Sequence, residues 1–322
     1  MKKISTITFY IICILVTVLT LVFFIPNSNV TNAKENRVII KIWNIDCFEG
    51  GSGSRSNFLK NIANNYTKKH SNILFLVTSH TVDSAKELIN KGVFPDVISY
   101  GACGIEILDQ VKIINNYSVR DGGVGGKQRY AVSWCKGNYF HLKRGNGGKV
   151  IISSNAHNFS TVAVSLEGLN LSEFEVLSSD VAYQTFLTSK NAELITTQRD
   201  VVKLIKRGVE FSCQPLKKYN DLFQYVSVTS LDNYKVGHCK NFIDYLLSEE
   251  SQKQLTNINM FSPLFSGLYS DNEYYKVAEG IKHEYTTFCL TSQLNLQNIK
   301  LQGEQSLINK NTNELIKSLK QL

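Results

Sequence analysis

The chain has 322 residues, of which 43% are hydrophobic and 19% charged, and its formal net charge is +8. This composition is typical of an ordered globular protein and excludes a disordered or collagen-like chain. Lysine and arginine are scattered, and the basic pairs Lys143-Arg144 and Lys217-Lys218 are isolated. Nucleic-acid binding requires a basic face with interleaved aromatic residues, and we therefore expect no nucleic-acid partner.

Residues 1–36 read as an export segment. Two lysines precede the uncharged apolar run Ile7 to Ile25, which Pro26 ends. This run is long for a cleaved signal peptide and long enough to span a bilayer. The segment is therefore either a signal peptide or an N-terminal membrane anchor. Both alternatives place residues 37–322 at the extracellular face of the cell membrane.

The exported part opens with a strand, a turn and a helix. The β-branched and apolar run Val38 to Trp43 predicts a strand buried on both faces. Gly50 to Gly53 predicts a tight turn, and Arg55 to His70 has apolar residues on one face at helical spacing. Such a unit opens an α/β fold whose loop faces a ligand crevice.

Strands and helices continue to alternate up to residue 100. Ile73 to Thr78 predicts a second strand, and Thr81 is placed to cap a helix over Val82 to Ile89. The apolar run Phe94 to Tyr100 predicts a third buried strand. The β-α-β-α-β order predicts a parallel, doubly wound sheet.

Cofactor, metal and enzyme motifs are missing from the sequence. The turn at Gly51 to Gly53 lacks the third glycine of a dinucleotide fingerprint and the Gly-Lys-Ser/Thr of a phosphate loop. The histidines show no H-x-x-x-H spacing and the cysteines no C-x-x-C spacing. We expect no cofactor, no metal and no catalysis. Whether the exported cysteines are buried free thiols or form disulfides is left open.

Five stretches, taken in order, resemble a known family. They are Lys41–Ile73 with the opening strand and loop, Lys91–Gly101 with the P-D-V strand end, Tyr130–Phe140, Tyr183–Ile205 and Phe242–Pro263. Together they resemble the extracellular solute-binding proteins of ABC importers, in the carbohydrate-binding group that includes maltose-binding protein. The stretch between Phe140 and Asp180 is short for this family and implies a shortened second lobe.

The resemblance implies an α/β, two-lobe periplasmic-binding-protein-like fold, with mostly parallel sheets flanked by helices and with discontinuous lobes. We expect lobe 1 to contain residues 37–130 and 180–212, and lobe 2 residues 131–179 and 213–322. The implied function is capture of a carbohydrate or related polar solute by hinged closure and its delivery to an ABC permease in the membrane. The alternative is an anchored extracellular sensor subunit that regulates a membrane partner. We expect a monomer.

Ligand contacts should lie at strand C-termini, where loops of both lobes meet. Tyr100 and Trp134 would stack on a sugar, while carboxylate, amide and guanidinium groups would bind its hydroxyls. Core packing is the alternative for the two tryptophans, and pairing with Asp200 is the alternative for Arg199. The candidate ligand-binding residues are Trp43, Asp46, Glu49, Tyr100, Trp134, Gln198 and Arg199.

Overall fold

The computed structural model describes residues 15–17, 37–46, 50–104, 107, 111, 123–124, 131–169, 171, 173–286 and 293–321. The chain divides into two units, Met1–Arg37 and Val38–Leu322. Apart from one helical turn at residues 15–17, the expected export segment lies outside the described residues. Within the described ranges, no helix has the length and apolarity needed to cross a membrane.

The unit Val38–Leu322 contains a six-stranded sheet in the order β2-β1-β3-β12-β5-β4. β1, β2 and β3 are parallel, which confirms the predicted β-α-β-α-β start. β3 is shorter than expected and begins after Asp96, whose carboxylate accepts a hydrogen bond from the Lys41 backbone N–H at 2.8 Å. The strands of this first sheet are β1 Val38–Ile45, β2 Ile73–His80, β3 Val97–Tyr100, β4 Gly123–Val124, β5 Ala131–Lys136 and β12 Phe223–Val228.

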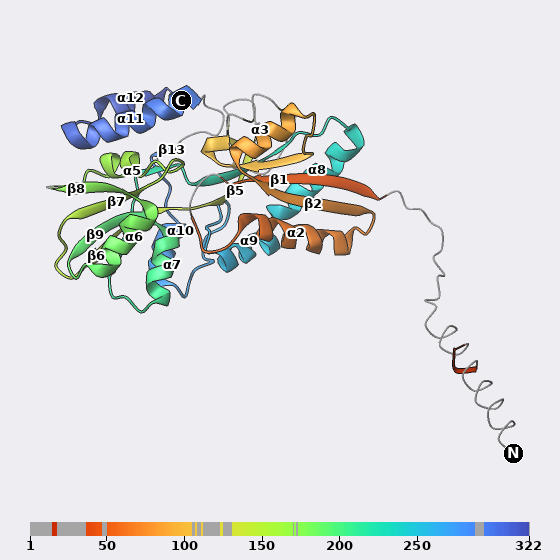
Figure 1. The fold of residues 1–322 in the computed structure, drawn as a ribbon, viewed down its shortest axis with the longest axis horizontal. Helices are drawn as coiled ribbons and strands as arrows, with labels where there is room; N and C mark the ends of the chain where they lie inside the picture. The colour runs from red at the N-terminus through yellow and green to blue at the C-terminus, as the bar shows by residue number, and fades with distance from the viewer. Residues whose placement is uncertain are drawn as a thin grey trace, which may run out of the picture. The chain divides into compact units, whose positions relative to one another are not determined.

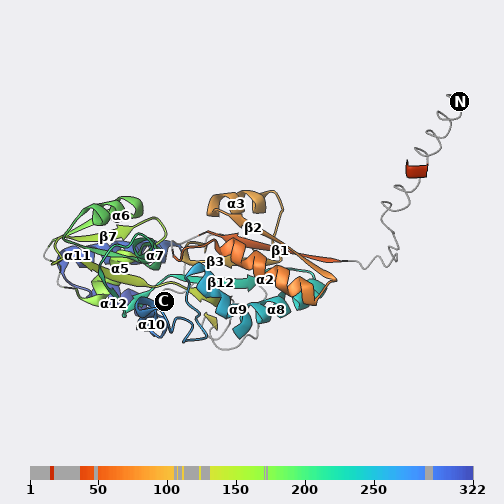
Figure 2. The same ribbon diagram turned by 90° about the horizontal axis from the view of Figure 1, so that it is seen from below.

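Helices cover both faces of the first sheet. α2 (Arg55–Lys69) and α3 (Val82–Asn90) lie on opposite sides of β1 and β2 (Figures 1 and 2). Alternation along β1 explains this, since Ile40 and Ile42 belong to the core cluster under α2 whereas Trp43 and Ile45 belong to the cluster under α3. α8 (Asn233–Leu246), α9 (Glu249–Lys253) and the 3₁₀ helix η2 (Gln254–Ile258) follow β12 in the chain.

A second sheet has the order β10-β6-β9-β7-β8. Its strands are β6 Tyr139–Arg144, β7 Val150–Ser154, β8 Phe174–Ser178, β9 Ala192–Thr197 and β10 Ser212–Pro215. α5 (Ser160–Glu167) lies on one side of it, and α6 (Ser179–Thr188) and α7 (Gln198–Lys206) lie on the other (Figure 1). α10 (Glu273–Glu279) packs on the α6 side, where Tyr275 contacts Phe140.

The strand pairing differs from the expected mostly parallel sheets and from the expected lobe boundaries. Both sheets are mixed, because β12 is antiparallel to β3 and β5, and β6 is antiparallel to β9 and β10. β9 belongs to the second sheet, although residues 180–212 were expected in lobe 1. β12 belongs to the first sheet, although residues 213–322 were expected in lobe 2. Both strands are placed by pairing between residues far apart in the chain.

The chain crosses between the two sheets at three places that lie side by side. β5 ends at Lys136, which exchanges two backbone hydrogen bonds of 2.9 Å with Phe261. The Gly137 N–H donates to the Leu222 carbonyl at 2.6 Å. Next to them, Asp221 accepts a 2.8 Å hydrogen bond from the Tyr139 hydroxyl, and burial raises the pKa of Asp221 to about 7. These adjoining crossings form the connection between the two sheets.

The C-terminal segment forms two helices, α11 (Gln293–Asn309) and α12 (Asn313–Lys320). Lys310 adopts the left-handed conformation (φ 52°), which ends α11. α11 packs on α5, where the Ser165 hydroxyl donates to the Gly303 carbonyl at 2.8 Å. A short pair of strands, β11 (Tyr219–Asn220) and β13 (Tyr285–Thr286), completes the fold.

Candidate functional site

The loop between β1 and α2 forms one wall of a cavity. Asp46 follows β1 directly and accepts a 2.8 Å hydrogen bond from the Asn44 side chain. Gly51 has φ +72°, and a Cβ there would overlap the Ile258 carbonyl oxygen. The neighbouring Ser52 N–H donates to that same oxygen at 2.9 Å. Only glycine allows the loop to approach the end of η2 this closely.

The loop leads into α2 through an N-cap residue. The Ser54 hydroxyl accepts from the Asn57 N–H at 3.2 Å, as expected of an N-cap residue. Arg55, the first residue of α2, is only 8% exposed. Its burial lowers the pKa of the guanidinium, and the neighbouring Cys135 and Asp46 oppose that effect. The start of α2 therefore brings a positive charge to the wall of the cavity.

Helix α7 of the second sheet forms the opposite wall. It follows β9 without a loop, so its first turn lies at the carboxyl end of that strand. The cavity has a volume of about 490 Å³ and is lined from both sheets. The lining residues are Asp46, Gly50, Gly51, Ser52, Gly53, Ser54, Arg55, Arg199, Val202, Lys203 and Lys206.

A buried carboxylate orients the cationic side chains of α7. Asp200 is fully buried and accepts a 2.6 Å hydrogen bond from the Thr196 hydroxyl. Arg199 Nε lies 3.1 Å from Asp200 Oδ1, and Lys203 Nζ lies 3.7 Å from the same oxygen. This is the Arg199–Asp200 pairing that the sequence analysis kept as an alternative. The ion pair fixes the guanidinium at the rim of the cavity, and Arg199 also lines it.

Two of the candidate ligand-binding residues line the cavity and one lies outside the described residues. Asp46 comes from the first sheet and Arg199 from the second, so the structure brings them to one cavity as expected of cleft residues. Glu49 falls in the segment 47–49, which the structure does not describe. Ligand contact by Asp46 and Arg199 remains a prediction.

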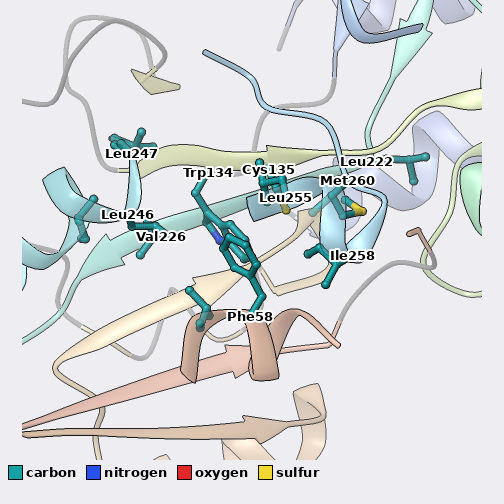
Figure 3. Close-up of a cluster of buried hydrophobic side chains, with 14 of the residues drawn as sticks. Phe58, Trp134, Cys135, Leu222, Val226, Leu246, Leu247, Leu255, Ile258 and Met260 are labelled. Atoms are coloured by element: carbon teal, nitrogen blue, oxygen red, sulfur yellow. The ribbon is translucent and has the colours of Figure 1, made fainter. Parts of the chain in front are cut away.

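The other four candidates are buried in the protein interior. Trp134 is fully buried, stacks on Phe58 at 5.3 Å between ring centroids (Figure 3), and donates from Nε1 to Ser99 Oγ at 3.0 Å. Tyr100 is also fully buried, with its hydroxyl 3.0 Å from Ser227 Oγ. In this structure both rings contact protein and not the cavity, and the stacking role expected of them has no support in their position.

Trp43 and Gln198 likewise lie away from the cavity lining. Trp43 is 4% exposed and packs against the ring of His80 at 4.8 Å. Gln198 is fully buried beside the crossings, where its Oε1 accepts from the Asn138 N–H at 3.1 Å. For Trp43 and Trp134 the structure agrees with the core alternative. Gln198 instead ties the start of α7 to the segment that connects the two sheets.

Sequence reasoning missed the cationic stripe of α7. Arg199, Lys203 and Lys206 are spaced i, i+4 and i+7 and therefore share one face of the helix. All three line the cavity. The spacing was visible in the sequence, but only the pairing of β9 with the second sheet tells which way that face points.

The described residues offer little for covalent or metal chemistry. No group of three or more His, Cys, Asp or Glu side chains within them could hold a metal ion. Cys135, Cys213 and Cys239 are free, and burial raises the pKa of each thiol to about 12. Thiols with such pKa values stay protonated and unreactive at neutral pH. Cys47 lies outside the described residues.

Two mixed β-sheets, each flanked by helices, are joined by adjacent crossings. This is the two-lobe α/β fold of the periplasmic substrate-binding proteins. No protein-family model matches the sequence, and no curated protein matches it either. Solved structures do match the fold. The sugar-binding protein MalE of Xanthomonas citri aligns with a TM-score of 0.63 over 88% of this chain and 96% of its own, at 10% identity.

Two further structures give the same picture. The cyclic α-maltosyl-1,6-maltose binding protein of Arthrobacter globiformis aligns with a TM-score of 0.62 over 88% of this chain and 97% of its own, at 9% identity. The spermidine/putrescine ABC transporter substrate-binding protein of Streptococcus pneumoniae aligns with a TM-score of 0.58 over 84% and 98%, at 11% identity. At these identities the likeness establishes the fold.

Proposed function

We propose that the chain is an extracellular solute-binding protein, which captures a small polar solute and presents it to an ABC-type membrane permease. The observation that carries the proposal is the cavity of about 490 Å³ between the β1–α2 loop of one sheet and α7 of the other. The adjacent crossings at Gly137, Asp221 and Phe261 supply the hinge that closure around a solute needs. The solved neighbours are binding proteins, which supports a role without catalysis.

Within this function, a carbohydrate is the solute class that we propose from the family resemblance. The two neighbours described as sugar-binding or maltose-binding support a sugar. The neighbour described as a spermidine/putrescine protein has the same fold, so the fold by itself is compatible with other small polar solutes. Asp46 and Arg199 are the residues of the original candidate set that we propose to contact the solute, one from each wall of the cavity.

A thermal-shift screen of the full-length chain in detergent tests the proposal. The panel contains maltose, glucose, glucuronate, glucose 6-phosphate, spermidine and free amino acids. A solute that binds only the folded protein stabilises it by about 2.7 kcal/mol at a concentration of 100 Kd, which raises Tm by roughly 5 °C. We expect one class of solute to give a rise that depends on concentration. Unchanged melting with every solute would count against solute binding.

A further inference from the structure

The walls of the cavity carry an excess of positive charge. Among the described lining residues, the side chains of Arg55, Arg199, Lys203 and Lys206 are cationic and that of Asp46 alone is anionic. Asp200 adds a second carboxylate behind the α7 wall. Four cations thus face two carboxylates in and around one cavity. A cavity lined mainly by one sign of charge raises the local concentration of ligands of the opposite sign, so this excess favours an anionic ligand.

The cations come from both sheets and differ in exposure. Arg55 on α2 is 8% exposed, whereas the Arg199 and Lys203 side chains on α7 are 18% and 43% exposed. A guanidinium that is held in place by a carboxylate is well suited to bidentate recognition of a carboxylate or phosphoryl group. An anionic group between the walls would be contacted from both lobes, and it would therefore favour the closed arrangement.

The described part of the lining offers no ring that could stack on the apolar face of a neutral sugar. No aromatic side chain is found among the described residues that line the cavity. Tyr100 and Trp134, the rings expected to stack on a sugar, are fully buried. The wall formed by α2 presents the first turn of that helix at Arg55. The positive end of the α2 dipole adds to the charge of the side chains.

We propose that the solute carries an anionic group, either a carboxylate or a phosphoryl group, and that Arg55, Arg199, Lys203 and Lys206 bind it. This inference rests on the proposed function and narrows its ligand class. An acidic sugar or a sugar phosphate agrees with the family resemblance, which suggests a sugar, and with the positive charge of the cavity. A neutral sugar agrees with the resemblance but not with the charge, and a polyamine would meet like charges on both walls.

Isothermal titration of the full-length chain in detergent tests this ligand class. The probes are glucuronate and glucose 6-phosphate, which distinguish the two anionic groups, with glucose, maltose, spermidine and inorganic phosphate as comparisons. We expect one or both anionic sugars to bind and glucose, maltose and spermidine to give no heat of binding. Raising the salt concentration from 50 mM to 500 mM should weaken the binding, because screening reduces the attraction between the charges.

Charge removal on α7 identifies the site. We expect Lys206→Gln to raise Kd about threefold, and Lys203→Gln combined with Lys206→Gln to raise it about tenfold. Lys320→Gln is the matched control, since Lys320 is also an exposed lysine at the last position of a helix. It should leave Kd unchanged. Because Lys203 also lies over the Tyr183 ring at 5.2 Å, Tm without solute is measured for each variant. The single variant Lys206→Gln keeps the test valid if the double variant unfolds.

The outcomes separate this inference from the function on which it rests. Binding of an anionic sugar that Lys206→Gln weakens and Lys320→Gln does not supports both. Binding of maltose, glucose or spermidine with the same Kd in the lysine variants overturns the anionic ligand and leaves the solute-binding function standing. Binding of inorganic phosphate alone, without either sugar, overturns the sugar part of the ligand. Absence of heat and of thermal shift with every probe overturns both.

Discussion

Replacing Trp134 by alanine is expected to lower the free energy of unfolding by about 3–5 kcal/mol in the absence of any solute. The ring is fully buried and stacks on Phe58 with an interplanar angle of 13° (Figure 3). Its removal leaves a cavity between β5 and α2 and takes away one of the hydrogen bonds of the Ser99 hydroxyl, which still accepts from Gln224 Nε2 at 3.1 Å. Urea unfolding of the full-length chain, followed by circular dichroism, measures the change as a lower midpoint with an unchanged slope.

Trp134→Phe is the milder substitution at this position. Phenylalanine keeps a ring that can stack on Phe58 but loses the 3.0 Å hydrogen bond to Ser99 and part of the buried ring volume, so the expected loss is about 1–2 kcal/mol. A Trp134→Ala variant that kept wild-type stability but lost its solute would contradict the core position and restore the stacking role expected from the sequence.

Gly51→Ala should have the second large effect, a loss of about 3 kcal/mol or more together with weaker solute binding. The left-handed conformation of Gly51 (φ +72°) costs a residue with a Cβ roughly 1–2 kcal/mol. The added methyl group would in addition overlap the Ile258 carbonyl oxygen, so the loop that forms one wall of the cavity has to move.

Gly92→Ala is the matched control for that substitution. Gly92 has nearly the same conformation (φ +76°), but nothing lies within 4 Å of a Cβ added there. It should therefore show only the backbone cost, about 1 kcal/mol, and no change in binding. Equal losses of stability in the two variants, measured by urea unfolding, would show that the contact with Ile258 is unimportant and that the loop is not held against η2.

The strands and helices between Val38 and Tyr100 were predictable because their signals are local. The signals are the apolar run in β1, the Thr81 cap of α3 and the helical spacing in α2, and each acts within one or two turns of the chain. The family resemblance supplied the two-lobe arrangement, which the fold confirms. Composition alone would not have given it.

Sheet membership was not predictable, because it depends on pairing between distant residues. β12 pairs Val226 with Ser99, and β9 pairs Ile195 with His141 and Ile152. The local sequences of these strands suit either sheet. The expected boundaries therefore put β9 in lobe 1 and β12 in lobe 2, whereas β9 pairs within the second sheet and β12 within the first.

The candidate site was predicted only in part, for a physical reason that differs between residue types. Tryptophan and tyrosine pack in cores as readily as they line clefts, so Trp134 and Tyr100 could not be assigned by type alone. Asp46 follows β1 directly and Arg199 lies in the first turn of the helix after β9, and both line the cavity. Lys203 and Lys206 were missed because the sequence does not show that their face of α7 lies opposite the β1–α2 loop.

The radius of gyration of the full-length chain, measured by small-angle scattering with and without the solute found by the thermal-shift screen, tests the central claim most directly. Two sheets that are joined by adjacent crossings and share one solute cavity should approach each other when the solute binds. We predict a smaller radius of gyration at saturating solute and the original value after the solute is removed by dialysis. A solute that raises Tm and leaves the radius of gyration unchanged would contradict capture by closure of the two lobes.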